Sequence, residues 1–258
     1  MARTAGQRPH RAAGTSQPGR IERASALASI WDLPERGSRG PKPRLDRDAI
    51  AAAAVRIADT EGPAALTMRR VASALGIATM SLYNYVPAKD HLAQLMIDRL
   101  AGEYSYPPQP PADRRRAVAD LARQARDIAR RHPWLPGLLH RPPPAGPNGL
   151  RYLDYFLGLL AGSRLDTGAK LEVIALVSGF ATMYGGMQAA LADERAGTGT
   201  SAAQQAAAQV QAFARAAASG RHPHLAAALA VAGPARAEED IFESCIVRLI
   251  EVALPAGG

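Results

Sequence analysis

Residues 67–91 read Thr-Met-Arg-Arg-Val-Ala-Ser-Ala-Leu-Gly-Ile-Ala-Thr-Met-Ser-Leu-Tyr-Asn-Tyr-Val-Pro-Ala-Lys-Asp-His, and this pattern decides the fold of the first half of the chain. It predicts a short helix over 67–75, a turn at Gly76, a second short helix over 79–85 and a further helix that begins near residue 87. Apolar residues on the inner sides of the two short helices can bury together and fix their angle: Val71, Ala72, Leu75, Ile77 and Leu82. Two helices joined by a Gly-containing turn are the layout that places the second helix in the major groove of DNA. The stretch therefore predicts a DNA-binding module.

The composition of the whole chain favours an all-α protein. Of its 258 residues 47% are hydrophobic and only 5% aromatic, alanine is abundant, and the β-branched runs expected of strands are missing. Beyond the short helices, apolar periodicity predicts helices over 46–60, 88–102, 113–131, 148–162, 168–193, 202–219 and 237–254. The stretch 194–201 is rich in glycine, threonine and serine, and we expect it to be mobile.

Proline and charge divide the chain into three parts. Four prolines within residues 105–112 indicate a spacer between a helix-turn-helix domain over 45–104 and a larger helical domain over 113–255. Residues 1–44 form a basic arm, largely disordered by composition, in which 21–33 is compatible with a short amphipathic helix.

The net charge of +8 lies mostly in that arm. Residues 1–44 carry nine Lys and Arg against three acidic residues, whereas 45–100 carry six of each sign. A basic arm beside a neutral module suggests a polyanionic partner, although a solvated tail would carry the same charge. Lys42 and Arg44 end an extended basic linker over 34–44 whose spaced cations suit phosphates or a minor groove.

Several other classes of protein find no support in the sequence. The single cysteine, Cys245, excludes an intramolecular disulfide and fits a reducing cytoplasm. No stretch approaches 18 apolar residues, so we expect no membrane span, and the N-terminus lacks the apolar region of a secretory signal. No Gly-rich phosphate loop, catalytic triad pattern or metal-ligand spacing occurs, so we expect no enzyme, no metal and no cofactor. The four histidines that we considered as metal ligands are His132, His140, His222 and His224.

From Leu66 to Leu92 the sequence resembles the TetR family of ligand-controlled transcriptional regulators. The resemblance rests on several motifs at fixed spacing: Glu61-Gly62, Leu66-Thr67-Met68-Arg69-Arg70-Val71-Ala72, Leu75-Gly76-Ile77, Ser81-Leu82-Tyr83-Asn84-Tyr85-Val86 and Lys89. A looser similarity in Arg131-His132-Pro133-Trp134-Leu135 points to the subgroup with a tetracycline-repressor-like C-terminal domain. The resemblance implies a three-helix helix-turn-helix domain followed by a larger helical domain for ligand binding and dimerisation.

The resemblance also implies which side chains contact double-stranded DNA. Thr67 would cap its helix and bond a phosphate, and Arg69 would reach a base edge or a phosphate. Base edges would be read by Thr79, Met80 and Ser81, and phosphates would be held by Tyr83, Tyr85 and Lys89. The sequence departs from the family at Ala78 and Ala88, where a capping side chain is usual, so we expect the starts of those two helices to be looser unless Thr79 takes over the first cap.

A ligand cavity within the larger domain is a further implication of the resemblance. Methionines and aromatic residues suit an adaptable apolar pocket for a small apolar or aromatic effector, although at helical spacing the same residues are often ordinary core. The candidate ligand-binding residues are Trp134, Asn148, Tyr152, Phe156, Met183, Tyr184, Met187 and Phe213.

The sequence thus favours a homodimeric cytoplasmic repressor that leaves a palindromic operator when a small molecule binds. One recognition helix contacts too few bases for a unique site, so a two-fold dimer is expected. The resemblance implies that helices 168–193 and 237–254 pair with their copies, and Gly179, Gly185 and Gly186 would permit the close approach. The alternatives are a transcriptional activator, a non-specific architectural DNA-binding protein, and a helical enzyme with an appended DNA-binding region.

Overall fold

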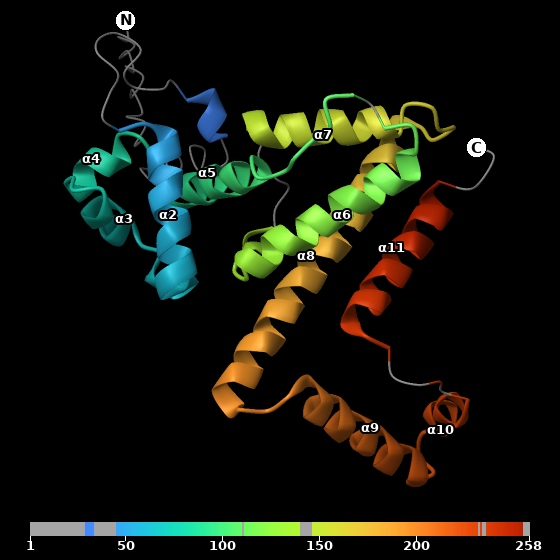
Figure 1. Ribbon diagram of the computed structural model, residues 1–258. Coiled ribbons are helices and arrows are strands. Elements are labelled where there is room, and N and C mark those ends of the chain that lie inside the picture. Colours follow the sequence, from blue (N-terminus) through green and yellow to red (C-terminus); the bar gives the residue numbers. More distant parts are fainter. Residues whose placement is uncertain are drawn as a thin grey trace, which may run out of the picture.

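The computed structural model describes residues 29–33, 45–109, 111–139, 146–231, 233 and 236–254, and within these ranges the protein is helical and has no strand. The all-α fold predicted from the sequence is therefore confirmed. Figure 1 shows a small group of helices at the N-terminal end and a larger body built around two crossing helices.

The small N-terminal domain contains α2 (Arg47–Glu61), α3 (Met68–Ala74) and α4 (Thr79–Tyr83), with the 3-10 turn η2 (Pro63–Ala65) between the first two. Asp46 caps α2, because its carboxylate accepts a hydrogen bond of 2.7 Å from the backbone N–H of Ala49. Gly62 ends the helix with a φ of +81°, a conformation that favours glycine. The longer α5 (Lys89–Ala101) leads from this domain to the body, and it contributes Leu92, Met96 and Leu100 to a shared apolar core.

The body is organised around α6 (Arg114–Arg131) and α8 (Thr167–Thr198), which cross at its centre (Figure 1). The short η3 (Leu135–Leu138) follows α6, and α7 (Pro147–Leu159) and α11 (Glu238–Ala253) pack against the crossing pair. A second apolar core lies between these four helices, and its largest fully buried side chains are Leu121, Phe156, Leu160, Phe242 and Ile246.

Two glycines of α8 allow α6 and η3 to approach closely. A Cβ on Gly185 would lie 2.2 Å from the backbone oxygen of Arg126, and one on Gly186 would lie 2.7 Å from Cγ of Pro136. The prediction that these glycines lie at a contact between two copies of the chain is wrong, because both are buried against the chain's own α6 and η3. Gly179, the third glycine of that prediction, does lie on the outer face of α8.

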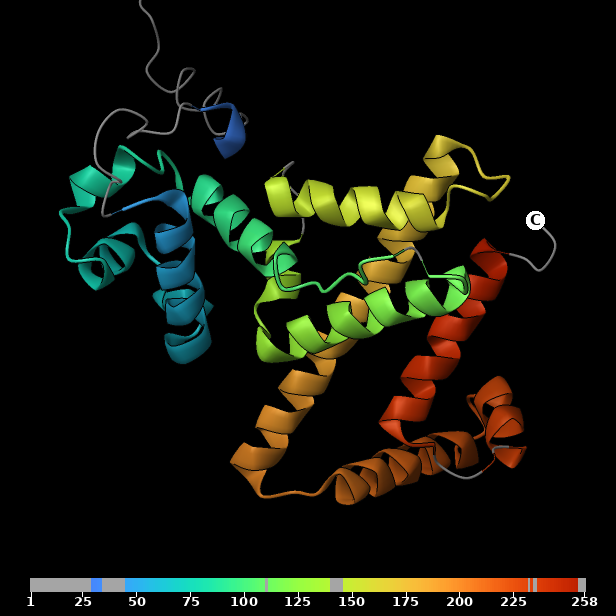
Figure 2. The ribbon, with the colours of Figure 1, turned by 45° about the horizontal axis from the view of Figure 1, so that its top comes forward.

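The helices α9 (Ala202–Ala218) and α10 (Pro223–Ala230) extend away from the body (Figures 1 and 2), and neither contains a buried residue. Helix α10, which starts with proline at its first position and continues in Ala and Leu, was not predicted from the sequence. The predicted end of α8 at residue 193 is also too early, since the helix continues through 194–198 and stops only at Gly199, where φ is +66°. Alanine, glutamate and arginine sustain the helix across that stretch despite Gly197.

One helix of the described part, α8, is long and apolar enough to cross a membrane by length and composition. The expectation that no segment approaches a membrane span was therefore too strong. Just under half of its most apolar window is buried inside the protein, along α6 and α11, and a buried core helix has the same composition.

Substituting Gly185 by alanine should destabilise the protein by about 1–3 kcal/mol, because the added methyl group would collide with the backbone of α6. Urea unfolding followed by circular dichroism measures this change. Gly197→Ala is the matched control in the same helix, because a Cβ there meets nothing within 4 Å, so its stability should be unchanged or slightly higher. Equal stability of the two variants would contradict the packing described for α6 and α8.

Candidate DNA-binding and effector sites

The turn between α3 and α4 is set by Gly76, whose φ of +68° reverses the chain after α3. The backbone N–H of Ile77 donates to the carbonyl of Ala72 at 3.0 Å and closes this turn. Val71 of α3 and Leu82 of α4 are fully buried in the shared core. These contacts hold α4 at one fixed angle to α3, as the sequence pattern predicts.

With Leu82 buried, α4 presents the predicted reading residues on its other side. Met80 is 75% exposed and Tyr83 is 40% exposed; Ser81 is exposed and Thr79 is half-buried. The helix starts at Ala78 without a hydrogen bond from any capping side chain, so Thr79 does not replace the missing cap. The exposed face is short and free to meet the edges of bases.

The predicted phosphate-contacting residues surround α4. The Thr67 hydroxyl oxygen accepts a hydrogen bond of 3.1 Å from the backbone N–H of Arg70 and so caps α3, as expected. Arg69 is exposed, Lys89 is exposed at the first position of α5, and Tyr85 packs partly against the domain core. Lys42 and Arg44 lie outside the described residues.

Arg70 of α3 pairs with Glu61 at the end of α2. Its Nε donates to Glu61 Oε2 at 2.9 Å, and this hydrogen bond lowers the pKa of the Glu61 carboxyl. Both groups face solvent, so the pair contributes little stability, but it orients α3 on α2.

A polar junction joins the end of α6 to the DNA-binding domain. The carboxylate of Asp59 on α2 accepts a hydrogen bond from the indole of Trp134 at 2.7 Å and lies 2.8 Å from Nδ1 of His132. The other imidazole nitrogen lies 3.2 Å from Glu103, just after α5. His132, considered above as a metal ligand, is thus buried between two carboxylates, and its motif Arg131-His132-Pro133-Trp134 was the available sequence signal.

A second junction joins α5 to the start of α7. Asp98 of α5 is buried and accepts hydrogen bonds from the backbone N–H of Gly149 at 2.9 Å and from the Asn148 side chain at 3.1 Å. The carboxylate therefore binds the N-terminal turn of α7, where backbone N–H groups are otherwise unpaired. Burial raises the pKa of Asp98, and the two hydrogen bonds only partly oppose this effect. Nothing in the local sequence predicted this contact between distant segments.

An aromatic cluster fills the space between α6, α7 and α8. The Tyr152 hydroxyl lies 2.5 Å from the Ser178 hydroxyl, and its ring centroid lies 4.5 Å from that of Tyr104. Phe156, one helical turn further along α7, is fully buried. Burial raises the pKa of Tyr152 to about 12, so this phenol is neutral and can donate a hydrogen bond at physiological pH.

The eight predicted ligand-binding residues do not line one common site within the chain. Tyr152 and Phe156 share the cluster just described, and Tyr184 lies further along, with its ring 5.3 Å from that of Phe242. Trp134 and Asn148 belong to the two junctions with the DNA-binding domain. The remaining three are exposed: Met183 and Met187 on the outer face of α8, and Phe213 on α9.

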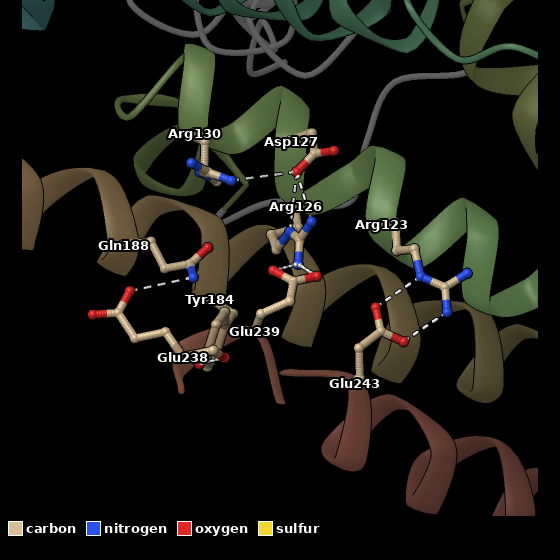
Figure 3. A network of polar contacts seen from close by, with 9 residues as sticks. All are labelled: Arg123, Arg126, Asp127, Arg130, Tyr184, Gln188, Glu238, Glu239 and Glu243. Atoms are coloured by element: carbon tan, nitrogen blue, oxygen red, sulfur yellow. Dashed lines mark hydrogen bonds and ion pairs between the residues drawn. The ribbon is translucent and has the colours of Figure 1, made fainter. Parts of the chain in front are cut away.

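Figure 3 shows the polar network that fastens α11 to α6. Arg126 is buried over the ring of Phe242, 4.4 Å from its centroid, and its Nη1 lies 2.7 Å from Glu239. Arg123 makes a two-pronged pair with Glu243, with hydrogen bonds of 2.7 and 2.6 Å. Tyr184 of α8 donates to the backbone carbonyl of Glu238 at 2.8 Å. These contacts therefore hold the start of α11 to α6 and α8.

The fold and these sites define a class of protein, an all-α regulator with a helix-turn-helix head on a separate helical body. The family model described as "Bacterial regulatory proteins, tetR family" matches residues 50–96, and the one described as "Tetracyclin repressor-like, C-terminal domain" matches residues 107–251. These matches cover more than half of the chain, so the protein belongs to the TetR family of transcriptional regulators. The resemblance drawn from residues 66–92, and the subgroup drawn from the body, are confirmed.

Similar proteins agree with this assignment. The chain is 37% identical over 221 residues to the HTH-type transcriptional repressor DrrR1 of Streptomyces coeruleorubidus, a match that spans 84% of this chain and 80% of the relative. An HTH-type transcriptional regulator of Saccharopolyspora erythraea is 32% identical over 155 residues, 60% of this chain and 65% of the relative. The solved structure of ActR from Streptomyces coelicolor in complex with actinorhodin has a TM-score of 0.67 at 25% identity, covering 83% of this chain and 98% of that one. The chain is thus a DNA-binding transcriptional regulator, as the sequence predicted.

Replacing Asp98 with asparagine should change how stability depends on pH. Burial raises the pKa of Asp98 in the folded protein above its value in the unfolded chain. The free energy of unfolding of the wild-type protein therefore falls as the pH rises from the unfolded pKa through the folded pKa. Asparagine does not ionise, so the stability of the variant relative to wild type should increase as the pH rises from about 4, near the unfolded pKa, through the folded pKa of Asp98. Urea unfolding across this range measures the difference, and Asp154→Asn, at an exposed position of α7, should show no such trend. A difference that falls with rising pH would contradict the assignment.

Proposed function

We propose that this protein is a repressor that binds a palindromic operator as a homodimer in the cytoplasm and is released by an aromatic small molecule. The observation that carries the proposal is the exposed face of α4, with Met80 and Ser81 directed outward from a helix held by a fully buried Leu82. Family membership and the similarity to a named repressor support the direction of regulation.

The outer face of α8 supports dimerisation. Leu176, Met183 and Met187 recur at helical spacing on this face and are 60%, 65% and 46% exposed, with Gly179 between them. Such an apolar stripe on a long helix suits contact with another helix. Exposed apolar residues of α11, Val247 and Val252, would extend the surface, and the projecting α9 and α10 would reach toward the second copy. A two-fold dimer would place two α4 helices on successive turns of DNA.

The aromatic cluster between α6, α7 and α8 supports an aromatic effector. Flat rings stack favourably on Tyr104, Tyr152 and Phe156, and the neutral phenol of Tyr152 with the Ser178 hydroxyl would bond a phenol or quinone oxygen. ActR, with which this chain shares its fold, has been solved with actinorhodin bound. We therefore assign the effector to aromatic compounds that carry oxygen substituents.

The two junctions supply a route from such an effector to DNA. A molecule that enters beside Tyr152 would displace α7 or α6, and these helices meet the DNA-binding domain at Asp98 and at Asp59. Moving either junction would change the separation of the two α4 helices and shift the population toward states that do not fit the operator.

The central test selects bound sequences from random DNA with the full-length protein and then measures their release by oxygen-substituted aromatic compounds, beginning with actinorhodin. The proposal expects a palindromic consensus and a modest salt slope. Weak binding to all sequences with a steep salt slope would instead favour a non-specific architectural protein. Activation of a reporter placed behind the operator would overturn repression.

Two kinds of substitution should separate base reading from phosphate binding. Lys89→Ala should weaken binding to every sequence similarly and reduce the salt slope by about 1, whereas Ser81→Ala should change which base is preferred, at about 1–3 kcal/mol. Fluorescence anisotropy on the selected sequence and its single-base variants distinguishes the two effects. A uniform loss for both variants would contradict the reading role of α4.

Tyr152→Phe should weaken release by an effector that bonds the phenol, by about 1 kcal/mol or roughly fivefold in concentration, without changing DNA affinity. Phenylalanine keeps the ring contact with Tyr104 and removes only the hydroxyl that bonds Ser178. Tyr83→Phe on α4 serves as the reciprocal control, because it should affect DNA binding and leave the response to the effector unchanged. Unaltered release by Tyr152→Phe would place the effector elsewhere.

A further inference from the structure

A short segment that precedes the DNA-binding domain is built into its core. Residues 29–33, here called the anchor segment, contain the 3-10 turn η1 (Ile30–Asp32), which lies beside α5 near the start of α7 (Figure 1, blue). Of the short amphipathic helix predicted over 21–33, residues 21–28 lie outside the described part of the chain. Ile30 is fully buried in the same core as Ile50 and Leu92, although it belongs to the part assigned to the arm.

Two hydrogen bonds hold the anchor segment to the DNA-binding domain. The backbone N–H of Ile30 donates to the Gln94 side-chain oxygen on α5 at 2.8 Å. The guanidinium of Arg47, the first residue of α2, donates to the backbone carbonyl of Leu33 at 2.8 Å and lies 5.8 Å from the ring of Trp31. Arg47 is buried, so this contact is protected from water. The segment therefore belongs structurally to the domain formed by α2 and α5.

Trp31 extends from this domain to the body. Gly146, the N-cap of α7, is packed so tightly that a Cβ would lie 2.8 Å from Cε2 of Trp31 and 2.2 Å from Oδ1 of Asp98. The indole thus lies against Arg47 of the DNA-binding domain and against the first turn of α7. Its Nε1 is buried and has no hydrogen-bond partner among the described residues. Trp31 therefore holds α7 by packing alone, and α7 can leave without breaking any hydrogen bond of the anchor segment.

We propose that the anchor segment is an intramolecular clamp that positions α7 relative to the DNA-binding domain. Ile30 is its fixed end and Trp31 its releasable end. Both are positioning residues, since neither lies on the reading face of α4 or in the aromatic cluster. The packing of Trp31 on α7 is independent of any effector. The role of the clamp in the release of DNA rests on the proposed function.

Hydrogen–deuterium exchange of the full-length protein tests the clamp directly. The amide of Gly149 bonds Asp98 and that of Leu150 bonds the carbonyl of Gly146, so both report on the docked first turn of α7. Trp31→Ala should accelerate their exchange roughly 10-fold. Asp32→Ala is the matched control, because Asp32 lies in the same turn and is exposed, and it should leave α7 unchanged. Acceleration confined to residues 29–33 would overturn the proposal.

Trp31→Phe is a second variant that separates the loss of ring packing on α7 from a general loss of folding. Phenylalanine retains an aromatic ring against Gly146 and removes the unpartnered indole N–H, so exchange in α7 should stay close to wild type. Circular dichroism should show the same helix content for all variants. If Trp31→Phe and Trp31→Ala accelerate α7 equally, ring packing is not the restraint and the proposal fails.

The link to DNA binding has its own readout, because the chain contains only two tryptophans. The emission of Trp31 is obtained as the difference between the tryptophan fluorescence of the wild-type protein and that of Trp31→Phe, which leaves Trp134 in place, and its quenching by iodide should differ at least twofold between free protein and protein bound to the selected DNA. Equal quenching in the two states would overturn the role of the clamp in DNA binding. Failure to select any DNA sequence would count against the proposed function and leave the exchange test of the clamp intact.

Discussion

The carboxylate of Asp59 accepts a hydrogen bond from the indole of Trp134 and lies 2.8 Å from the imidazole of His132, and this contact fixes the DNA-binding domain to the body. Asp59 lies on α2, which carries α3 and α4 through a shared core. His132 and Trp134 follow directly after α6, the helix that crosses the body. Half-buried hydrogen bonds of this kind are costly to leave unmade, so they hold the end of α6 to the DNA-binding domain.

Small residues make this arrangement possible. Gly185 and Gly186 let α8 press against α6 and η3, and Gly146 lets α7 approach Asp98 and Trp31. Each glycine removes the one atom that would keep two elements apart, so the body is a packed unit in which displacement of one helix is passed to its neighbours. The paired arginines of α6 extend the same unit to α11 (Figure 3).

Local patterns in the sequence were enough to predict the DNA-binding head. The turn at Gly76, the cap at Asp46 and the inward Leu82 are each set by residues within a few positions. Contacts between distant segments could not be predicted in this way. Gly185 was assigned to the wrong partner helix, and Ile30 was assigned to an arm, because helical periodicity shows which face is apolar but not what covers it.

The predicted ligand-binding residues also show that helical spacing does not identify what covers each face of a helix. Met183, Tyr184 and Met187 lie one turn apart in sequence, yet Tyr184 faces Phe242 while both methionines face outward. Met187 follows Tyr184 by three residues and Met183 by four, which places it near both on a helix without deciding which side meets the core. The junction residue Asn148 looked like a pocket residue because its partner Asp98 is 50 positions away.

Control of DNA binding by the body can be measured as the distance between the two DNA-binding domains of the dimer, by electron spin resonance of a label on Ala74→Cys, at an exposed position of α3, in a Cys245→Ser background. With the selected operator bound, we expect one narrow distribution on the order of 35 Å, about one turn of DNA. Adding a releasing aromatic compound should shift that distribution by several ångströms. The same distribution in both states would contradict the claim that the body controls DNA binding by moving its heads.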